Sequence, residues 1–502
     1  MGNKRVVVVG GGIAGLSYLQ GLKVEHDDGS PQFGEVILIS ESRLVKKFVN
    51  EEQRGRELVT FDVAQADAST LGASTLPTGV KFRFLAAKLI SVNSSSRVLT
   101  VLTRGGEEHI FYDALCLCCG SRPKKLHSLN QSHLDKVSDR LIVLRDLTTV
   151  EALQEKLVGS KRLAVVGSGG IGLELVGKIR NCEITWIVKD SYIGCNYFDS
   201  GAAKFLVEKL ESANYSPHPA NVIRPEAYDS ATEIEGATNV GQTQTTPTNF
   251  GPALGPNWSK LLKSSDVATC QSLQIIYQDE VADIQLNEDA LEDKLVVLTK
   301  KGLKINCDLV AIAIGVEPNV PDVSPEPLKI SDKDGGVLID DQMRTSAPNI
   351  YAAGDMVSCD QWPTNDLWFQ MRLWTQAKQM GFYAGRCTAC HLAKRDPSLY
   401  FNFDCFTHCT TFFGQRLVLL GRYNGQGITE EETSRCEVIA RVIKETDYIK
   451  LLLKENRIIG AVLIGDTGLE ETIENLIHDQ IDVSDQKDRL LDGSIDIADY
   501  FD

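Results

Sequence analysis

The sequence predicts an α/β protein that contains two copies of one strand–glycine–helix unit, followed by a C-terminal α/β region. Two observations support this prediction. Each copy begins with apolar, mostly β-branched residues that lead into G-x-G-x-x-G and then into an apolar helical pattern. Each copy also closes with an apolar strand that ends in glycine, with proline three residues later. The pattern indicates two Rossmann-like folds, in which parallel strands alternate with helices.

The first repeat starts near the beginning of the chain. Val6–Val9 form a predicted buried strand. The glycines that follow are Gly10, Gly12 and Gly15. They permit a tight turn, a close approach of a pyrophosphate and close helix–strand packing, in that order. The helix that begins at Ile13 and Ala14 directs free N–H groups toward the phosphates, so a dinucleotide site is expected here.

The second predicted strand, Glu35–Ile39, follows a polar loop at 26–34. In this fold an acid that binds the ribose is expected about 20 residues past the glycines. Ser40 occupies the expected place and Glu41 follows one position later. Both residues are therefore candidates for the ribose contact.

The second repeat has the same order of elements. A strand at Leu163–Val166 precedes Gly167, Gly169 and Gly172, and the next predicted strand ends at Lys189 and Asp190. A site for NAD needs an acid for the ribose 2′-hydroxyl, whereas a cation suits the 2′-phosphate of NADP. Lys189 therefore favours NADPH slightly, and Asp190 leaves NADH open.

Composition limits the class of protein. The net charge of −16 disfavours direct binding to nucleic acid or to an anionic membrane. We expect neither a leader nor a transmembrane helix, because no apolar run reaches roughly 18 residues. The thirteen cysteines have no framework spacing, which is typical of buried thiols in a reducing compartment.

The two glycine motifs, the two strand–Gly–x–x–Pro exits and the segment Thr345–Asp355 together resemble the pyridine nucleotide-disulfide oxidoreductase superfamily over about residues 5–390. The resemblance implies that the first repeat binds FAD, with Asp355 on the ribityl chain and Gly354 beside the flavin, and that the second repeat binds NAD(P)H. The implied layout is a FAD-binding domain at 1–145 and 305–395, an NAD(P)H-binding domain at 146–304 with a polar insertion at about 212–265, a C-terminal α/β domain at 396–490 and an acidic tail at 491–502.

Further segments extend the resemblance to one branch of this family over the whole chain. They are residues 167–176, 370–377, 460–465 and 469–472 and the C-terminal Asp-Tyr-Phe-Asp. This resemblance implies a nuclear and cytoplasmic FAD-dependent NAD(P)H oxidoreductase that helps to protect a tRNA-splicing ligase from oxidation. Trp374, Gly120 and Gly315 are further candidates for cofactor contact.

The resemblance also implies a catalytic ion pair. In the family a glutamate on the second nucleotide-binding helix pairs with a lysine beside the flavin. Glu174 matches the glutamate, Lys46 is the best candidate for the lysine, and Lys47 is the second. A cation there would stabilise negative charge on reduced flavin. The alternative is that these are solvated surface charges.

The paired cysteines of the family's disulfide reductases are not found, because residues 40–60 contain no cysteine. The C-x-x-C pair Cys387 and Cys390 lies late in a predicted helix over Leu367–Cys390, whereas thiolates are stabilised at helix N-termini. Cys405, His408 and Cys409 lack a partner pair with zinc spacing, so no metal site is predicted.

Three functions remain open at this point. The first is a FAD-dependent NAD(P)H oxidoreductase without a dithiol relay, in which a hydride passes from NAD(P)H to flavin N5 and the electrons then pass to an unnamed acceptor. The second is a slow-turnover, flavin-based redox sensor or protector that acts by binding a partner protein. The third is a true disulfide reductase, which needs a dithiol close to the flavin.

Overall fold

The computed structural model describes residues 4–23, 32–71, 76–126, 129, 131–144, 147–179, 182–211, 272–287, 294–360, 362, 367–397, 403–444 and 446–492. The predicted insertion at about 212–265 lies outside these residues, as does nearly all of the predicted tail at 491–502. The chain divides into a first unit (Met1–Val49, Val63–Arg122 and Val316–Asp404) and a second unit (Asn50–Asp62, Pro123–Gly315 and Cys405–Asp502). Among the described helices, none has the length and apolar character needed to span a membrane.

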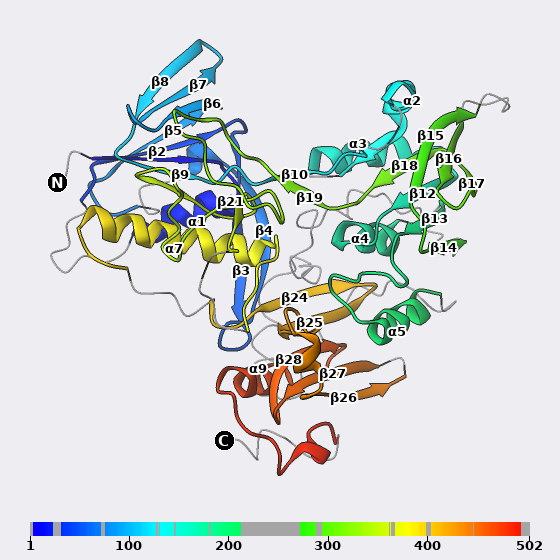
Figure 1. Ribbon diagram of the computed structural model, residues 1–502. Helices are drawn as coiled ribbons and strands as arrows, with labels where there is room; N and C mark the ends of the chain where they lie inside the picture. The colour runs from blue at the N-terminus through cyan, green and yellow to red at the C-terminus, as the bar shows by residue number, and fades with distance from the viewer. Residues whose placement is uncertain are drawn as a thin grey trace, which may run out of the picture. The chain divides into compact units, whose positions relative to one another are not determined.

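The first unit is built on a five-stranded parallel sheet with the order β22-β9-β1-β2-β5 (Figure 1). The strands are β1 (Arg5–Val9), β2 (Glu35–Ser40), β5 (Lys81–Ala86), β9 (Ala114–Leu117) and β22 (Ile350–Ala352). The predicted run of valines forms β1, the central strand, which pairs with β2 on one side and β9 on the other. Its position between two strands explains why these valines are buried and carry no alternation.

Two helices of the first unit lie side by side, as Figure 1 shows in blue and yellow: α1 (Ile13–Gly21) and α7 (Trp374–Leu392). Glycine makes their close contact possible. A Cβ atom on Gly381 of α7 would lie 2.2 Å from the carbonyl oxygen of Ala14 on α1. The backbone of α7 therefore packs directly on the first turn of α1, which fixes the position of that turn.

The rest of the first unit is antiparallel or short. A four-stranded sheet has the order β20-β6-β7-β8, and β21 pairs with β23. These strands are β6 (Lys88–Asn93), β7 (Val98–Thr103), β8 (Gly106–Phe111), β20 (Val323–Ser324), β21 (Val337–Leu338) and β23 (Val357–Ser358), and η1 (Ala68–Thr70) is a short 3-10 helix.

The two predicted glycine–proline exits pair with each other. Ser121–Pro123 forms β10 and Val316–Pro318 forms β19, and these strands make a two-stranded sheet. The chain passes from the first unit to the second at β10 and returns at β19. The repeat of this short motif in the sequence thus corresponds to one paired crossover.

The second unit contains the second repeat, on a parallel sheet with the order β11-β18-β12-β13-β14. Its strands are β11 (Leu141–Val143), β12 (Arg162–Val166), β13 (Glu183–Val188), β14 (Leu273–Tyr277) and β18 (Leu309–Ile312), and its helices are α2 (Gln131–Val137), η3 (Ser138–Arg140), α3 (Leu147–Leu157), α4 (Gly170–Lys178) and α5 (Ser200–Glu211). A three-stranded antiparallel sheet follows, made of β15 (Val281–Asn287), β16 (Lys294–Thr299) and β17 (Lys304–Cys307). Apolar side chains of β12, β18, β15 and β16 share one buried cluster, which joins the two sheets.

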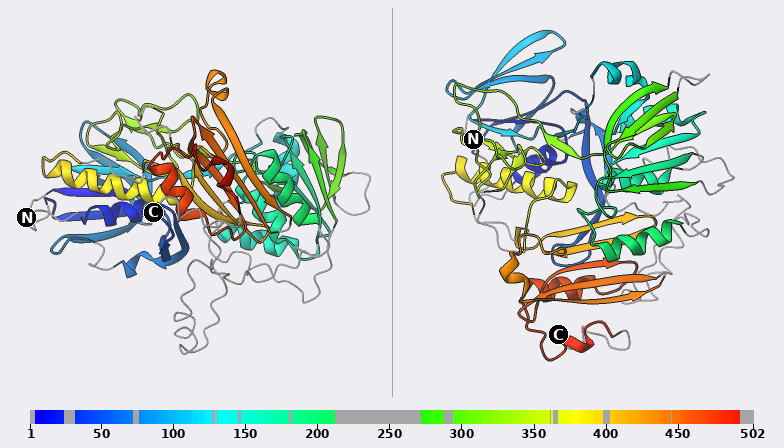
Figure 2. Two further views of the ribbon diagram at one scale, coloured as in Figure 1. Left: turned by 90° about the horizontal axis from the view of Figure 1, so that it is seen from below. Right: turned by 45° about the vertical axis from the view of Figure 1, so that its right-hand side comes forward.

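The second unit also contains the predicted C-terminal α/β region, a five-stranded antiparallel sheet with the order β24-β25-β28-β27-β26 (orange and red in Figure 2). Its elements are β24 (Thr407–Phe412), β25 (Gln415–Gly421), α8 (Glu430–Thr433), β26 (Cys436–Ile443), β27 (Asp447–Lys454), β28 (Arg457–Ile464), α9 (Glu470–His478) and η8 (Lys487–Arg489). Helix α9 packs on β28 and β25. The fold class predicted from the sequence, two Rossmann-like domains and a C-terminal α/β domain, is confirmed.

A long hairpin was not predicted. It consists of β3 (Leu44–Gln53) and β4 (Val59–Asp67), and its tip, Asn50–Asp62, belongs to the second unit. The buried Glu474 of α9 holds the tip, because its carboxylate accepts hydrogen bonds from the backbone N–H groups of residues 56, 57 and 58 at 2.9, 2.6 and 2.9 Å. The hairpin is therefore anchored by a residue more than 400 positions away in sequence.

The predicted helix over Leu367–Cys390 begins too early. The helix starts at Trp374. Before it, the side chain of Gln370 donates to the backbone oxygen of Val357 at 2.8 Å and accepts from the backbone N–H of Cys359 at 2.9 Å. These bonds tie the preceding stretch to β23, so its apolar residues are buried without forming a helical turn.

Candidate functional site

The first glycine turn has the geometry that a dinucleotide needs. Gly10 has a φ of +118°, and a Cβ atom there would lie 2.1 Å from the carbonyl oxygen of Cys118. A Cβ on Gly15 would lie 1.9 Å from the oxygen of Gly10, so the helix can approach the strand only with glycine. In front of Gly12 there is open space within 4 Å. No side chain caps the helix at Gly12, which leaves its N-terminal N–H groups for a phosphate.

Ser40 lies beside this turn, and Glu41 follows it in the chain. Ser40 is the last residue of β2, and a Cβ on Gly11 would come within 2.9 Å of its hydroxyl oxygen. Glu41 is exposed, and its charge acts on the neighbouring thiol of Cys119. A hydroxyl and a carboxylate thus lie at the end of the second strand, where the ribose contact was expected.

Asp355 lies at the end of β22, on the same edge of the sheet. Gly354 has a φ of +79°, and a Cβ there would lie 2.8 Å from the Cβ of Ala14, so glycine lets this loop approach the start of α1. The Asp355 carboxylate accepts a hydrogen bond from the hydroxyl of Ser121 at 2.9 Å, next to Gly120. Burial raises the pKa of Asp355, against the opposing effects of Ser121 and of nearby cations. This edge of the sheet therefore holds an acceptor that a ribityl hydroxyl could bind.

Lys46 and Arg372 are the cations that act on Asp355. The backbone N–H of Lys46 donates to the oxygen of Gly11 at 3.1 Å, which places this lysine beside the glycine turn. Its Nζ lies 5.6 Å from the ring centroid of Trp374, the first residue of α7, within cation–π range. The structure therefore brings the predicted residues Lys46, Asp355 and Trp374 into one region of the first unit.

Sequence reasoning missed Arg372. Its Nε donates to the backbone oxygen of Asp355 at 2.8 Å, and its guanidinium forms a 2.7 Å ion pair with Asp334. The arginine thereby fixes the loop that carries Asp355. Arg372 lies inside the segment 370–377 that supported the resemblance, so a signal was present in the sequence.

The second glycine turn repeats the geometry of the first. Gly167 has a φ of +99°, and its Cβ would lie 2.4 Å from the oxygen of Ala313. A Cβ on Gly172 would lie 2.2 Å from the oxygen of Gly167, whereas Gly169 has open space before it, with its nearest atom at 3.9 Å. Gly169 also caps α4 without a side-chain bond. The residues present thus fit a dinucleotide at both turns, and Gly315, at a φ of +94°, leaves open space at the second exit just as Gly120 does at the first.

Glu174 is buried on α4, with 5% of its surface exposed. Its charge acts on Tyr197, and burial together with this charge raises the pKa of the tyrosine to about 12. The Tyr197 ring lies 6.3 Å from the ring of His408 on β24 and 5.5 Å from that of Phe412. Lys46 belongs to the other unit, so its pairing with Glu174 stays a prediction.

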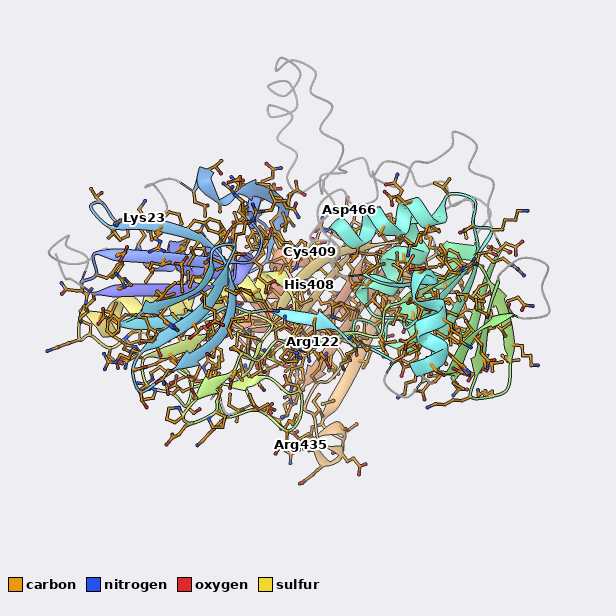
Figure 3. All side chains as sticks on the ribbon, turned by 90° about the horizontal axis from the view of Figure 1, so that it is seen from above. Lys23, Arg122, His408, Cys409, Arg435 and Asp466 are labelled. Carbon is orange, nitrogen blue, oxygen red and sulfur yellow. The ribbon has the colours of Figure 1, made fainter. Side chains whose placement is uncertain are left out.

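His408 was considered in the sequence only as a metal ligand. It is 7% exposed, and among the described residues its Nδ1 has no hydrogen-bond partner. Burial lowers its pKa to about 4, so the imidazole is neutral near pH 7. Figure 3 labels it on β24 next to Cys409. Within the described residues no group of histidine, cysteine, aspartate and glutamate could hold a metal ion.

Lys189 directly follows β13, where the coenzyme ribose is expected, but it contacts an acid that was not predicted. Its Nζ lies 3.7 Å from Oε2 of Glu280, and Nζ of Lys300 lies 3.1 Å from Oε1 of the same residue. The carboxylate of Asp190 accepts a hydrogen bond from the thiol of Cys195 at 3.1 Å. The corner thus carries two lysines and two acids, rather than the single lysine and aspartate that the sequence suggested.

The described thiols near the first turn are buried. The sulfur atoms of Cys116 and Cys118 on and after β9 are 3.6 Å apart, a pair that the sequence analysis missed although alternate residues of a strand share a face. Burial raises the pKa of Cys116 well above its usual value. Cys387 lies near the C-terminal end of α7, as predicted, and burial raises its pKa to about 12. Such thiols are poor nucleophiles.

Two known protein families match this chain, one over most of its length and one near its C-terminus. The family described as pyridine nucleotide-disulphide oxidoreductase matches residues 4–241 and 244–381. A second family, the rubredoxin NAD+ reductase C-terminal domain, matches residues 425–481.

Curated relatives match over their full length. Proteins named pyridine nucleotide-disulfide oxidoreductase domain-containing protein 1 are 35% identical in Mus musculus, over 99% of this chain and 98% of the relative, and 37% identical in Drosophila melanogaster, with the same coverage. Solved structures with the same fold include the covalent putidaredoxin reductase–putidaredoxin complex, with a TM-score of 0.63, 17% identity and coverage of 100% of this chain and 99% of that one. A water-forming NADH oxidase from Lactobacillus brevis bound to NADH has a TM-score of 0.60 and 17% identity, with 96% and 92% covered.

Proposed function

The chain belongs to the pyridine nucleotide-disulphide oxidoreductase family, and from this premise we propose that it oxidises NAD(P)H without a dithiol relay and delivers the electrons to an acceptor outside the chain. It is an FAD-dependent NAD(P)H oxidoreductase. When bound, FAD supplies the redox chemistry by accepting a hydride at N5 from NAD(P)H and by passing electrons onward. The single observation that supports two dinucleotide sites is the matched pair of glycine turns, each with open space at its middle glycine.

In the first unit, residues of the chain would bind the phosphates and a sugar hydroxyl of FAD and would place a positive charge beside it. The uncapped N-terminus of α1 offers N–H groups to a pyrophosphate, and Asp355 offers its carboxylate to a sugar hydroxyl. Lys46 supplies positive charge beside the turn, held over the face of Trp374. A fixed cation next to a group that gains negative charge on reduction favours that reduction.

In the second unit the uncapped N-terminus of α4 would hold the pyrophosphate of NAD(P)H. Glu174 follows in the same helix and brings a buried carboxylate near the turn. The nicotinamide ring becomes cationic when it gives up a hydride, and a nearby negative charge stabilises this oxidised form. Glu174 therefore acts as an electrostatic partner for the coenzyme and, in the proposal, as the group that orients Lys46.

We propose that no dithiol relay operates because burial disfavours the thiolate form of the candidate cysteines. A relay needs a thiolate, but burial raises the pKa of Cys116 well above its usual value and raises the pKa of Cys119 and of Cys387 to about 12. The sulfur atoms of Cys116 and Cys118 are 3.6 Å apart, and both residues are buried. Electrons are therefore proposed to leave without a cysteine intermediate.

Purified protein tests this function directly. We expect a flavin absorbance spectrum, loss of the flavin band on anaerobic addition of NADH or NADPH, and recovery of the band in air. Colourless protein that yields no FAD on denaturation and takes none up on addition would refute the proposal. If the protein retains FAD but neither NADH nor NADPH bleaches it, the proposed electron donor is wrong, whereas the proposed FAD site still stands.

A second candidate is a slow-turnover redox sensor or protector that acts by binding a partner. From the sequence resemblance we propose that such a protein is nuclear and cytoplasmic and that its partner is a tRNA-splicing ligase complex. The observation that favours a partner is the edge strand β26, where Val438, Val442 and Ile443 are exposed by 60%, 56% and 47%. Turnover below one per minute together with specific pull-down of the ligase complex would support this candidate, whereas fast turnover without pull-down supports the first.

A further inference from the structure

The corner at the ends of β13 and β14 contains an acid whose role neither glycine turn explains. Two backbone bonds hold these ends together: Gln278 N–H to Asp190 O at 3.0 Å, and Asp279 N–H to Val188 O at 3.2 Å. Glu280 follows immediately. Because the carboxyl ends of parallel strands meet at one edge of the sheet, Glu280 lies beside the residues that end β13.

The backbone around Glu280 is fixed from a second side. Asp279 is buried, and its Oδ1 accepts the backbone N–H of Glu280 at 2.8 Å and that of Lys301 at 3.2 Å. The N–H of Lys300 also donates to the backbone oxygen of Glu280 at 2.8 Å. The position of Glu280 is therefore set by the fold and does not depend on its own ion pairs.

The charges at this corner balance. Lys189 and Lys300 contact opposite oxygens of the Glu280 carboxylate, at 3.7 and 3.1 Å. The Lys300 contact, followed by the charge of Lys189, lowers the pKa of Glu280, which keeps it ionised near neutral pH. Asp190, next to Lys189 in the chain, adds a second negative charge, so the charges of these four side chains sum to zero.

We propose that Glu280 is the residue that selects between the two coenzymes, by neutralising both lysines that a ribose 2′-phosphate would use and by accepting a hydrogen bond from a 2′-hydroxyl. The inference rests on the proposed binding of NAD(P)H at the second turn. It assigns the wild-type preference to NADH, although Lys189 by itself favours NADPH. A doubly charged phosphate would meet two lysines that are already paired with Glu280, whereas a hydroxyl would meet an acceptor.

The test isolates the adenosine end of the coenzyme. ADP-ribose and 2′-phospho-ADP-ribose are titrated calorimetrically into the FAD-loaded protein, since neither can reduce the flavin. Glu280→Gln frees both lysines and removes one repulsion, so the ratio of the two dissociation constants should shift toward the phosphorylated fragment by roughly tenfold. Glu183→Gln is the matched control, because Glu183 is exposed and begins β13, at the end of that strand away from Lys189.

Lys189→Met should shift the ratio in the opposite direction by a few-fold, which tests the same corner with a second variant. The shift in Glu280→Gln should shrink as salt rises, because the charges are partly exposed. An unchanged ratio in Glu280→Gln, or an equal change in Glu183→Gln, overturns the inference. Failure of wild-type protein to bind either fragment would instead refute the proposed coenzyme site.

Discussion

Replacing Lys46 by methionine is the sharpest test of the flavin site. The methionine keeps an unbranched apolar stem against the face of Trp374 and removes only the charge. The bond from the backbone N–H of residue 46 to Gly11 O is unaffected by the side chain. The turn should therefore keep its shape, and FAD content should stay at the wild-type level.

The expected effect follows from electrostatics. At an effective dielectric constant near 20, two unit charges about 4 Å apart interact by roughly 4 kcal/mol. Lys46 is half-buried, so solvent should reduce the net loss to about 1–2 kcal/mol. This loss corresponds to roughly five- to thirtyfold slower reduction. It also corresponds to a two-electron flavin potential lower by roughly 20–40 mV.

The assay is anaerobic stopped-flow bleaching of the flavin band by NAD(P)H, with the potential measured against a reference dye. Lys47→Met is the matched control, because Lys47 is the exposed neighbour in the same strand and should bleach at the wild-type rate. If Lys46→Met matches wild type in both rate and potential, the lysine is a solvated surface charge. If Lys47→Met is the slow variant, the site exists but uses the other lysine.

Three further predictions use other parts of the site. Glu174→Gln should slow bleaching by a similar factor, and its combination with Lys46→Met should cost less than the sum of the two losses if the residues act as a pair; additive losses would separate them. The double variant Cys387→Ser/Cys390→Ser should bleach at the wild-type rate with full FAD content, and a large loss of rate would show that the helix carries a relay after all. Because burial lowers the pKa of His408 from 6.5 to about 4, the unfolded chain binds its proton more readily, and this residue should cost the fold about 3 kcal/mol as pH falls from above 6.5 to below 4. Urea unfolding of wild type and His408→Gln across this range measures the effect, and parallel curves would contradict it.

Local sequence predicted the nucleotide turns because the chemistry that fixes them is local. A β-branched strand, three glycines at fixed offsets and a helix form one continuous stretch, and the close approaches at Gly10 and Gly15 are contacts within it or with the adjacent strand. The carboxylate of Asp355 could be found for the same reason, because its neighbouring residues form a specific pattern. Its supporting cation, Arg372, could not be assigned a role, because neither segment by itself indicates that the two are in contact.

The hairpin β3–β4 depends on contacts between residues far apart in the sequence, which a local sequence pattern cannot predict. The outer half of β3, residues 50–53, is exposed and polar, so this strand lacks the alternation of a half-buried strand. The hairpin exists as an ordered element because Glu474 accepts three backbone N–H groups at its tip, and that acid comes from the last helix of the chain. Glu280 escaped prediction in the same way, since only the pairing of β13 with β14 brings it to Lys189.

The two glycine turns share their backbone geometry but differ in the charges around them, and this difference suits the proposed direction of hydride transfer. The proposed flavin turn has Lys46 beside it and Arg372 on the adjoining loop, both of which favour a partner that gains negative charge. The proposed coenzyme turn is followed on α4 by the buried carboxylate of Glu174. A carboxylate favours the cationic oxidised nicotinamide, so each turn lowers the energy of the state that hydride transfer produces. Reversing either charge, by Lys46→Glu or Glu174→Lys, should therefore slow anaerobic bleaching of the flavin more than the neutral variants Lys46→Met and Glu174→Gln do.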